Sequence, residues 1–344
     1  MPRNFVNLLC LLVVLCLTGA MAGSAFGQKE KLPKTPKIKE FPPATPTTEP
    51  PGFFDEGGVT SEKSMIVDSN VLVKLCVAHG ELRINGWQRN EVRVFVKDGR
   101  NFRMKPLEKS EQGKVNWLWI GNVVEGRPGP SAECLAGESI EIDAPLGASL
   151  DLSGREVRTS VDSLKKVKVT IGSGAIVLRN ITGGINAETG RGDVMVESSA
   201  GAISVTGYTG NVVITDVKSG QIGDQLKART NTGAVTMQNV EHRQIDANSI
   251  SGSILFDGKF LSGGIYKFRT SSGSIRVVVP TASSFTFTAT YGDGELNTEL
   301  PHKILTENIT PQANIVVAKV GAGDATVNLT TTNGSISIAK QKVY

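Results

Sequence analysis

The residues that could perform catalysis are few and widely spaced. The 344 residues include three histidines, His79, His242 and His302, and none has the spacing of a metal-binding motif. Cleavage of a polysaccharide needs carboxyl groups that converge in a groove. The aspartates of the second half of the chain show no regular pairing: Asp216, Asp224, Asp246 and Asp257. No Gly-x-Ser-x-Gly nucleophile elbow occurs between a strand and a helix. The sequence therefore predicts that the protein is not an enzyme, with no catalytic, cofactor-binding or metal-ligating residues.

Two short motifs suggest ligand binding. Residues 191–193 spell Arg-Gly-Asp, a tripeptide that integrins recognise, but Gly192 also fills the glycine position of a repeat, so we interpret the match as coincidence. Nine-residue calcium repeats need paired glycines and an aspartate at one fixed position of every unit. Asp193, Asp216 and Asp246 do not recur at one position, so the sequence predicts no structural calcium.

Residues 1–27 are predicted to be a signal peptide. Arg3 supplies a positive charge, residues 8–17 form a short apolar segment, and residues 25–27 (Ala-Phe-Gly) fit a cleavage site between small residues. Retention of the segment as an anchor is the alternative, although its apolar run is shorter than the ~20 residues of a spanning helix. No later segment is long and apolar enough to span a membrane as a helix. We expect an exported protein that is periplasmic, cell-surface or secreted.

Residues 28–64 are predicted to be a linker rich in proline and lysine. Seven of the fifteen prolines lie between Gln28 and Gly52, interleaved with five lysines. A segment of this composition cannot build a hydrophobic core and is expected to be extended.

Two cysteines, Cys76 and Cys134, remain after removal of the signal peptide. In an exported chain such a pair is expected to form a disulfide bond, and two buried thiols are the alternative. On the chain-entropy estimate, closing this loop would stabilise the fold by about 4 kcal/mol.

A nine-residue repeat indicates which elements position these groups. Five glycines are nine residues apart, and an apolar residue lies seven positions before each of them: Gly174, Gly183, Gly192, Gly201 and Gly210. The later glycines at 233, 252, 273 and 294 are 19, 21 and 21 residues apart, and a further unit ends at Gly334. The longer spacing suggests that one coil contains about two repeats. A short fixed period is typical of a solenoid, in which each unit buries its apolar face by stacking on its neighbours.

We therefore predict an all-β protein in which residues 161–344 form a parallel β-solenoid, similar to a β-helix. Residues 65–160 alternate between apolar and polar positions, which predicts half-buried strands that cap the solenoid at its N-terminal end. Trp87, Trp117 and Trp119 are expected to pack in this cap rather than to stack on a sugar. The inward-facing residues are predicted to be Ile176, Leu178, Val194, Val196, Ile203, Val205, Val212 and Ile214, with Leu226, Ala228, Ile245, Ala247, Tyr266 and Phe268 in the later units.

Several segments resemble a bacterial family known as putative adhesins of unknown function. The resemblance rests on His-Gly-Glu-Leu-Arg-Ile-Asn-Gly-Trp at 79–87, Asn-Glu-Val-Arg-Val at 90–94, Ile-Glu-Ile-Asp-Ala-Pro at 140–145 and the Ser-Gly-Ser-Ile units at 251–254 and 272–275. It implies a β-solenoid in an exported or envelope-associated protein, and it implies no catalytic residues.

These observations favour non-catalytic binding or adhesion at the cell envelope. The net charge of +4 is small for this length, so it favours neither nucleic acid nor an anionic membrane as a partner. Outward Ser, Thr and Asn side chains could bind a cell-surface glycan. A structural or sensory protein with an envelope protein as its partner is the alternative, and a polysaccharide-active β-helix enzyme is the second alternative.

Overall fold

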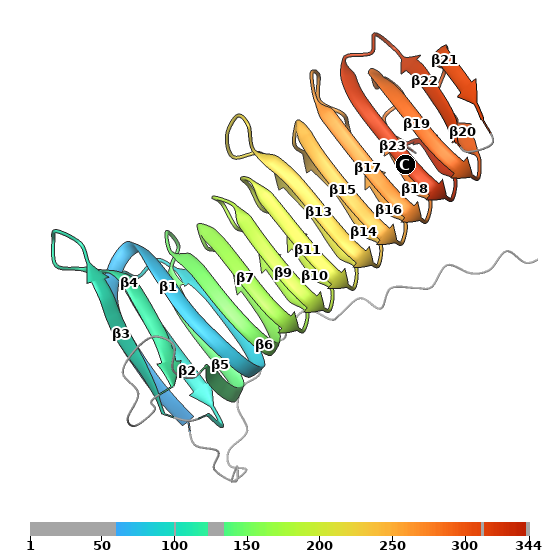
Figure 1. Ribbon diagram of the computed structural model, residues 1–344. Helices are drawn as coiled ribbons and strands as arrows, with labels where there is room; N and C mark the ends of the chain where they lie inside the picture. The colour runs from blue at the N-terminus through green and yellow to red at the C-terminus, as the bar shows by residue number, and fades with distance from the viewer. Residues whose placement is uncertain (1–59, 100, 123–133, 311–312, 342–344) are drawn as a thin grey trace, which may run out of the picture. The chain divides into compact units, whose positions relative to one another are not determined.

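The computed structural model describes residues 60–99, 101–122, 134–310 and 313–341. Within these ranges the chain forms 24 strands and no helix, so no helix there could cross a membrane (Figure 1). The predicted signal peptide and residues 28–59 of the predicted linker lie outside the described residues. The prediction of an all-β parallel solenoid is confirmed.

The first six strands form the N-terminal end of the stack: β1 (Thr60–Trp87), β2 (Glu91–Lys97), β3 (Phe102–Lys109), β4 (Val115–Asn122), β5 (Leu135–Pro145) and β6 (Ser149–Asp162). The regular coils contain β7 (Lys166–Ser173), β8 (Ile176–Arg179), β9 (Ile185–Arg191), β10 (Val194–Glu197), β11 (Ile203–Thr209), β12 (Val212–Lys218), β13 (Gln225–Thr232), β14 (Val235–Glu241), β15 (Gln244–Ser251), β16 (Ile254–Asp257), β17 (Ile265–Ser272) and β18 (Ile275–Val279). The last strands are β19 (Phe285–Asp293), β20 (Leu296–Thr298), β21 (Lys303–Ile309), β22 (Asn314–Val320), β23 (Ala325–Asn333) and β24 (Ile336–Lys340).

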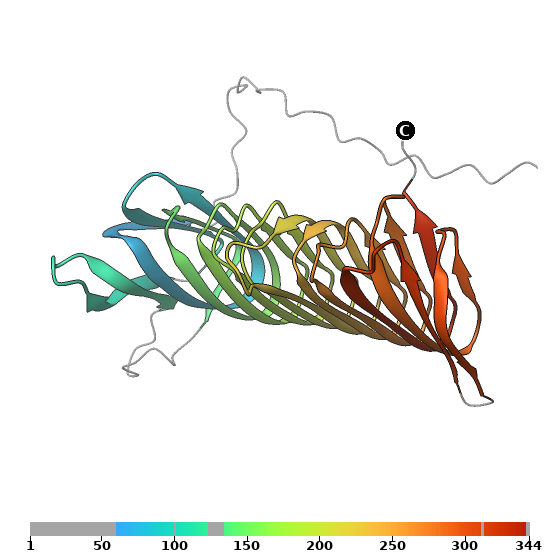
Figure 2. The same ribbon diagram turned by 90° about the horizontal axis from the view of Figure 1, so that it is seen from above.

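Each regular coil contributes one strand to each of two sheets. Strands β7, β9, β11, β13, β15 and β17 pair in parallel and form sheet 1, whereas β8, β10, β12, β14, β16 and β18 form sheet 2. Figure 2 shows the coils following one another with the interior between the two sheets. Ile185 of β9 pairs with Ile203 of β11, eighteen positions later, so one coil holds two nine-residue repeats.

The core consists of ladders of apolar side chains between the sheets. Because side chains of a strand alternate between its two sides, every second residue points inward and stacks on its counterpart in the next coil. The residues predicted to point inward are all buried, so the predicted inside–outside register is confirmed. One ladder of sheet 1 contains Val167, Ile185, Ile203, Leu226, Ile245, Tyr266 and Val327.

A ladder of hydroxyl groups lies next to the corner between the sheets. A Thr or Ser three residues before the corner glycine donates a hydrogen bond to the carbonyl oxygen of the corner glycine in the preceding coil. The oxygen–oxygen distances are 2.8–3.2 Å for Thr189, Thr230, Ser249, Thr270 and Thr331. The hydroxyl groups therefore join neighbouring coils, in addition to the backbone hydrogen bonds of the sheets.

The corner requires glycine because the coils approach each other closely there. Gly210 has a φ of 135°, a conformation that side chains disfavour, and a Cβ atom at this position would lie 2.3 Å from the carbonyl oxygen of Gly192. The same contact recurs from coil to coil, which explains the strict glycine position of the repeat.

The coils begin before the regular repeat. β1 passes from sheet 1 to sheet 2 at Gly80, and β6 pairs with both halves of it in parallel. On the other side of β1 lie β4 and β5, followed by the antiparallel strands β3 and β2. The boundary predicted between residues 160 and 161 falls inside β6.

The last coils do not stack in sequence order. Gly294 follows Gly273 by 21 residues in the sequence, but their coils are not neighbours. Instead, β23 and β24 pair with β17 and β18, so the coil of Gly334 lies on that of Gly273. Strands β19 and β20 lie on the far side of β23 and β24 (Figure 1). Only this order leaves an edge of β19 for the antiparallel strand β22, which itself pairs with β21.

Candidate functional site

The outer surface of sheet 1 carries a compact group of charged side chains over β13, β15 and β17. We name Lys227, Arg229, Lys267 and Arg269 the basic cluster. All four are exposed, and Asp246 of the middle strand lies among them. Four positive charges against one negative charge give this patch a net charge of +3, which makes it the candidate site.

The parallel register fixes the positions of these side chains. One ladder across the three strands contains Lys227, Asp246 and Lys267 as direct neighbours. The next ladder contains Arg229, Asn248 and Arg269. Neighbouring strands lie about 4.8 Å apart, so the two lysines start from backbone positions about 10 Å apart.

Asp246 holds the two arginines. Its carboxylate accepts from Arg229 Nη2 at 3.4 Å and from Arg269 Nη2 at 3.3 Å, and its side chain is 25% exposed. Arg229 and Arg269 themselves are about half exposed. Neither Lys227 nor Lys267 forms an ion pair with any residue that the structure describes. Their ammonium groups are therefore available to a ligand.

A shallow depression of 220 Å³ lies beside the lysines, at the start of the three strands. Its polar side chains include Gln225 and Gln244, and Ile265 supplies an apolar surface that is 45% exposed. The three residues are direct neighbours in a further ladder of sheet 1. Amide groups, aliphatic surface, two lysine ammonium groups and the Asp246 carboxylate thus border one hollow. Its net charge of +1 and its polar groups suit a polar ligand that carries a negative charge.

The basic cluster was not among the sequence predictions, although the repeats contain its signal. When the units Leu226-x-Ala228-x-Thr230 and Tyr266-x-Phe268-x-Thr270 are aligned, both intervening pairs read Lys and Arg. The unit between them has Asp and Asn at the same positions. Aligning the units by their corner glycines therefore shows the repeated Lys and Arg, whereas the strand register is needed to show that they are neighbours.

The structure does not bring the other aspartates together. Asp216 lies within β12, where its backbone has a φ of 54°, and its side chain accepts from Asn239 Nδ2 at 2.6 Å. Asp224 is buried and accepts from the backbone N–H groups of Gly220 and Gln221, both at 2.8 Å. Asp257 lies at the end of β16, on sheet 2. Asp216 and Asp224 are thus held by nearby hydrogen-bond donors, and Asp257 lies on the other sheet from the basic cluster.

The Arg-Gly-Asp tripeptide is part of a corner. Gly192 is the corner glycine of its coil, with a φ of 131°. Asp193 Oδ1 accepts from the backbone N–H of Asn211 in the next coil at 2.7 Å. The aspartate thus takes part in the coil-to-coil contacts.

The three histidines lie in separate places. His242 is fully buried, its Nε2 lies 2.9 Å from the carbonyl oxygen of Gly201, and its Nδ1 has no partner among the described residues. Burial lowers the pKa of His242. His302 Nδ1 lies 3.0 Å from the carbonyl oxygen of Leu300, and His79 is exposed at the Gly80 corner. In the described ranges, no group of three or more His, Cys, Asp or Glu side chains could hold a metal ion.

The tryptophans lie in the N-terminal strands. The Trp87 indole N–H donates to the carbonyl oxygen of Glu91 at 2.7 Å, and the guanidinium groups of Arg89 and Arg93 lie 5.0 and 5.4 Å from its ring. Trp117 and Trp119 lie on β4, where Trp119 is 8% exposed. None of the three borders the depression beside the basic cluster.

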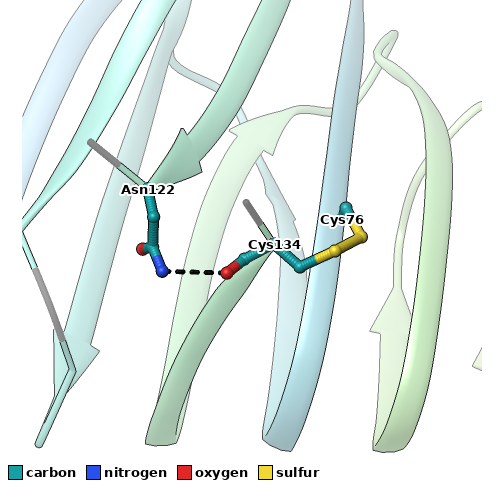
Figure 3. The surroundings of a disulfide bond; sticks show 3 residues. All are labelled: Cys76, Asn122 and Cys134. Atoms are coloured by element: carbon teal, nitrogen blue, oxygen red, sulfur yellow. Dashed lines mark hydrogen bonds between the residues drawn. A yellow bond between two sulfur atoms is a disulfide. The ribbon is translucent and has the colours of Figure 1, made fainter. Parts of the chain in front are cut away.

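Cys76 and Cys134 form a disulfide bond, with their Cα atoms 4.4 Å apart (Figure 3). Cys76 lies on β1 and Cys134 directly precedes β5. The Asn122 side-chain amide donates to the carbonyl oxygen of Cys134 at 2.8 Å. The disulfide and this hydrogen bond join the strands at the N-terminal end of the stack.

The fold defines a class of proteins: parallel β-solenoids with two-sheet coils and ladders of polar side chains on the outside. The sequence profile of the Toastrack DUF4097 family matches residues 162–339, just over half of the 344 residues, and the chain belongs to this family. The resemblance to a family of unknown function is thereby confirmed.

Similarity to individual proteins is low. No curated protein matches its sequence. A solved structure, described as that of a putative cell adhesion protein from Clostridium sporogenes, is similar at 13% sequence identity with a TM-score of 0.24, over 82% of this chain and 100% of that chain.

Proposed function

We propose that this protein is an exported, non-catalytic binding protein of the cell envelope that holds a polymer on the outer surface of sheet 1. The observation that carries this proposal is the basic cluster with its depression on three paired strands. Backbone hydrogen bonds fix the spacing of these strands, so the backbone positions of the contacting residues are preorganised and binding orders only their side chains.

Export is supported by the disulfide bond. Bonds such as Cys76–Cys134 form and persist in oxidising compartments outside the cytosol. The predicted signal peptide at residues 1–27 leads to the same location.

A binding screen tests the proposal. The mature chain, from Gln28 to Tyr344, is passed over immobilised polysaccharides and purified cell-wall polymers, and the bound mass is followed with protein concentration. We expect saturable binding to at least one polymer. Folded protein that binds none of them would overturn the proposal.

The same polymers test the absence of catalysis. We expect no release of oligosaccharides during long incubation with the mature chain. Release that disappears on substitution of one aspartate, such as Asp246→Asn, would identify an enzyme instead.

The end of sheet 1 favours a second candidate function, a structural envelope protein with a protein partner. β21 pairs with β22 along one edge, and no described strand pairs with its other edge. All seven residues of β21 are exposed, among them Ile304, Leu305 and Ile309. An unpaired edge with apolar side chains can accept an extended strand from another protein.

Crosslinking in the cell envelope tests this second candidate. Leu305→Lys should abolish capture of the partner, because a charge opposes addition of a strand. Ile222→Lys, at a fully exposed loop residue, is the matched control and should leave capture intact. Equal capture by both variants would exclude β21 as the binding edge.

A further inference from the structure

The ion pairs of Asp246 divide the basic cluster into two kinds of cation. Arg229 and Arg269 already share a carboxylate, at 3.4 and 3.3 Å. Lys227 and Lys267 lie on the two sides of the same residue and form no ion pair within the described part of the chain. Asp246 thus lies between the two lysines without forming an ion pair with either, and the lysines are the groups that an anion can pair with.

The two lysines define a direction as well as a charge. They are separated by two strand spacings, about 10 Å, along the stacking direction of the coils. This separation is comparable with the length of a disaccharide unit. A chain that lies across the three strands would also pass over Gln225 and Gln244, whose amide groups can both donate to and accept from hydroxyl groups.

We infer that the basic cluster binds a linear acidic polysaccharide, with Lys227 and Lys267 paired to its carboxylate or sulfate groups and Gln225 and Gln244 bound to its hydroxyl groups. Ile265 contacts the apolar face of a sugar ring. This inference rests on the proposed binding function and names the ligand class. Exposed ion pairs are weak individually, so strong binding requires several cluster–polymer contacts at once.

Two other kinds of polyanion fit the site less well. The depression has no aromatic side chain on which a nucleic-acid base could stack. A flat anionic membrane would cover more of sheet 1, where the outward carboxylate of Glu188 would be repelled and Lys168 is already paired with Asp151. A narrow polymer contacts the cluster alone.

Binding to defined polymers tests the inference. The probes are polygalacturonate for carboxylates, dextran sulfate for sulfates and dextran as the neutral polymer, each at low and high salt, with phosphatidylglycerol vesicles and duplex DNA as the other polyanions. We expect binding to an acidic polymer that weakens at high salt and is absent with dextran. The double variant Lys227→Gln/Lys267→Gln should lose affinity about tenfold.

Two further variants make the test specific to the cluster. Lys166→Gln/Lys168→Gln removes the same charge from β7 of the same sheet and should keep nearly full affinity. Lys168 pairs with Asp151 at 3.6 Å, but both side chains are partly exposed, so losing this pair should change stability little. Lys227→Arg/Lys267→Arg retains the charge and should retain most of the binding. All three variants change exposed side chains, and their thermal unfolding should match that of the unmodified protein.

The outcomes separate this inference from the proposed function. Equal binding of dextran, or an equal loss in the β7 variant, would overturn the ligand class while the binding function stands. Binding to vesicles or duplex DNA alone would overturn the inference as well. Folded protein that binds none of the polymers would overturn both.

Discussion

Replacing Gly207 with serine should stabilise the solenoid, because this glycine interrupts the hydroxyl ladder. Gly207 pairs with Thr189 on one side and with Thr230 on the other. Each threonine donates to the corner carbonyl oxygen of its preceding coil, at 3.2 and 3.0 Å. Gly207 has no side chain that could do the same for the carbonyl oxygen of Gly192.

The structure sets the size of the effect. A Cβ atom at Gly207 would meet nothing closer than the Thr230 hydroxyl oxygen at 3.8 Å, so a small side chain fits without displacing its neighbours. Gly207→Ala removes the flexibility of glycine from a strand, which is worth about 0.5–1 kcal/mol. A hydrogen bond from serine adds about 1 kcal/mol. Gly207→Ser should therefore be about 1–2 kcal/mol more stable than the unmodified protein.

Urea unfolding followed by far-ultraviolet circular dichroism measures this difference, because the strands of all coils contribute to the signal. The midpoint should rise from the unmodified protein to Gly207→Ala and again to Gly207→Ser, with an unchanged dependence on urea. Thr230→Ala should lower it by the loss of an equivalent hydrogen bond. A serine variant no more stable than the alanine variant would refute the role assigned to the hydroxyl ladder.

Three further predictions concern a corner glycine, a buried hydroxyl group and a buried histidine. Gly210→Ala should destabilise the protein by more than the ~1–2 kcal/mol of an unfavourable φ, because its Cβ atom would also overlap the carbonyl oxygen of Gly192. Gly223 has a φ of 95° and open space around it, so Gly223→Ala should cost only the energy of the unfavourable φ. Thermal unfolding of both variants measures the difference. Thr159→Val should stabilise by about 1 kcal/mol in urea unfolding, because the buried Thr159 hydroxyl has no hydrogen-bond partner among the residues that the structure describes. Thr189→Val, which loses a hydrogen bond, should destabilise. Burial lowers the pKa of His242 in the folded protein, so near the ordinary value of 6.5 the unfolded chain binds more protons than the folded chain. The free energy of unfolding should therefore decrease as the pH falls below about 7. An equal decrease in the His242→Asn variant would contradict this.

The core could be predicted because its signal is local. Alternation places every second side chain of a strand on the same side, so Ile203 and Val205 are inward wherever their neighbours lie. Each unit needs a glycine at its corner, because a side chain there would overlap the backbone of the preceding coil. Both features repeat within a few residues and need no knowledge of long-range pairing.

The basic cluster depends on pairing across the chain. Lys227 and Lys267 are forty positions apart and become neighbours of Asp246 only through the register of β13, β15 and β17. Loops of different length separate these units, so a fixed nine-residue period does not align them. Their ion pairs and the depression follow from the side-chain positions that this register sets.

The amino-acid sequence by itself determined the all-β class, the repeat, and the residues that face the core, because each follows from alternation and glycine spacing within one coil. The tertiary structure alone decided which coils are neighbours. Tyr266, Val327 and Phe287 are all apolar at the same core position, so hydrophobic stacking permits either order of the last two coils. The antiparallel strand β22 needs a free edge of β19, and this long-range pairing places β23 between β17 and β19.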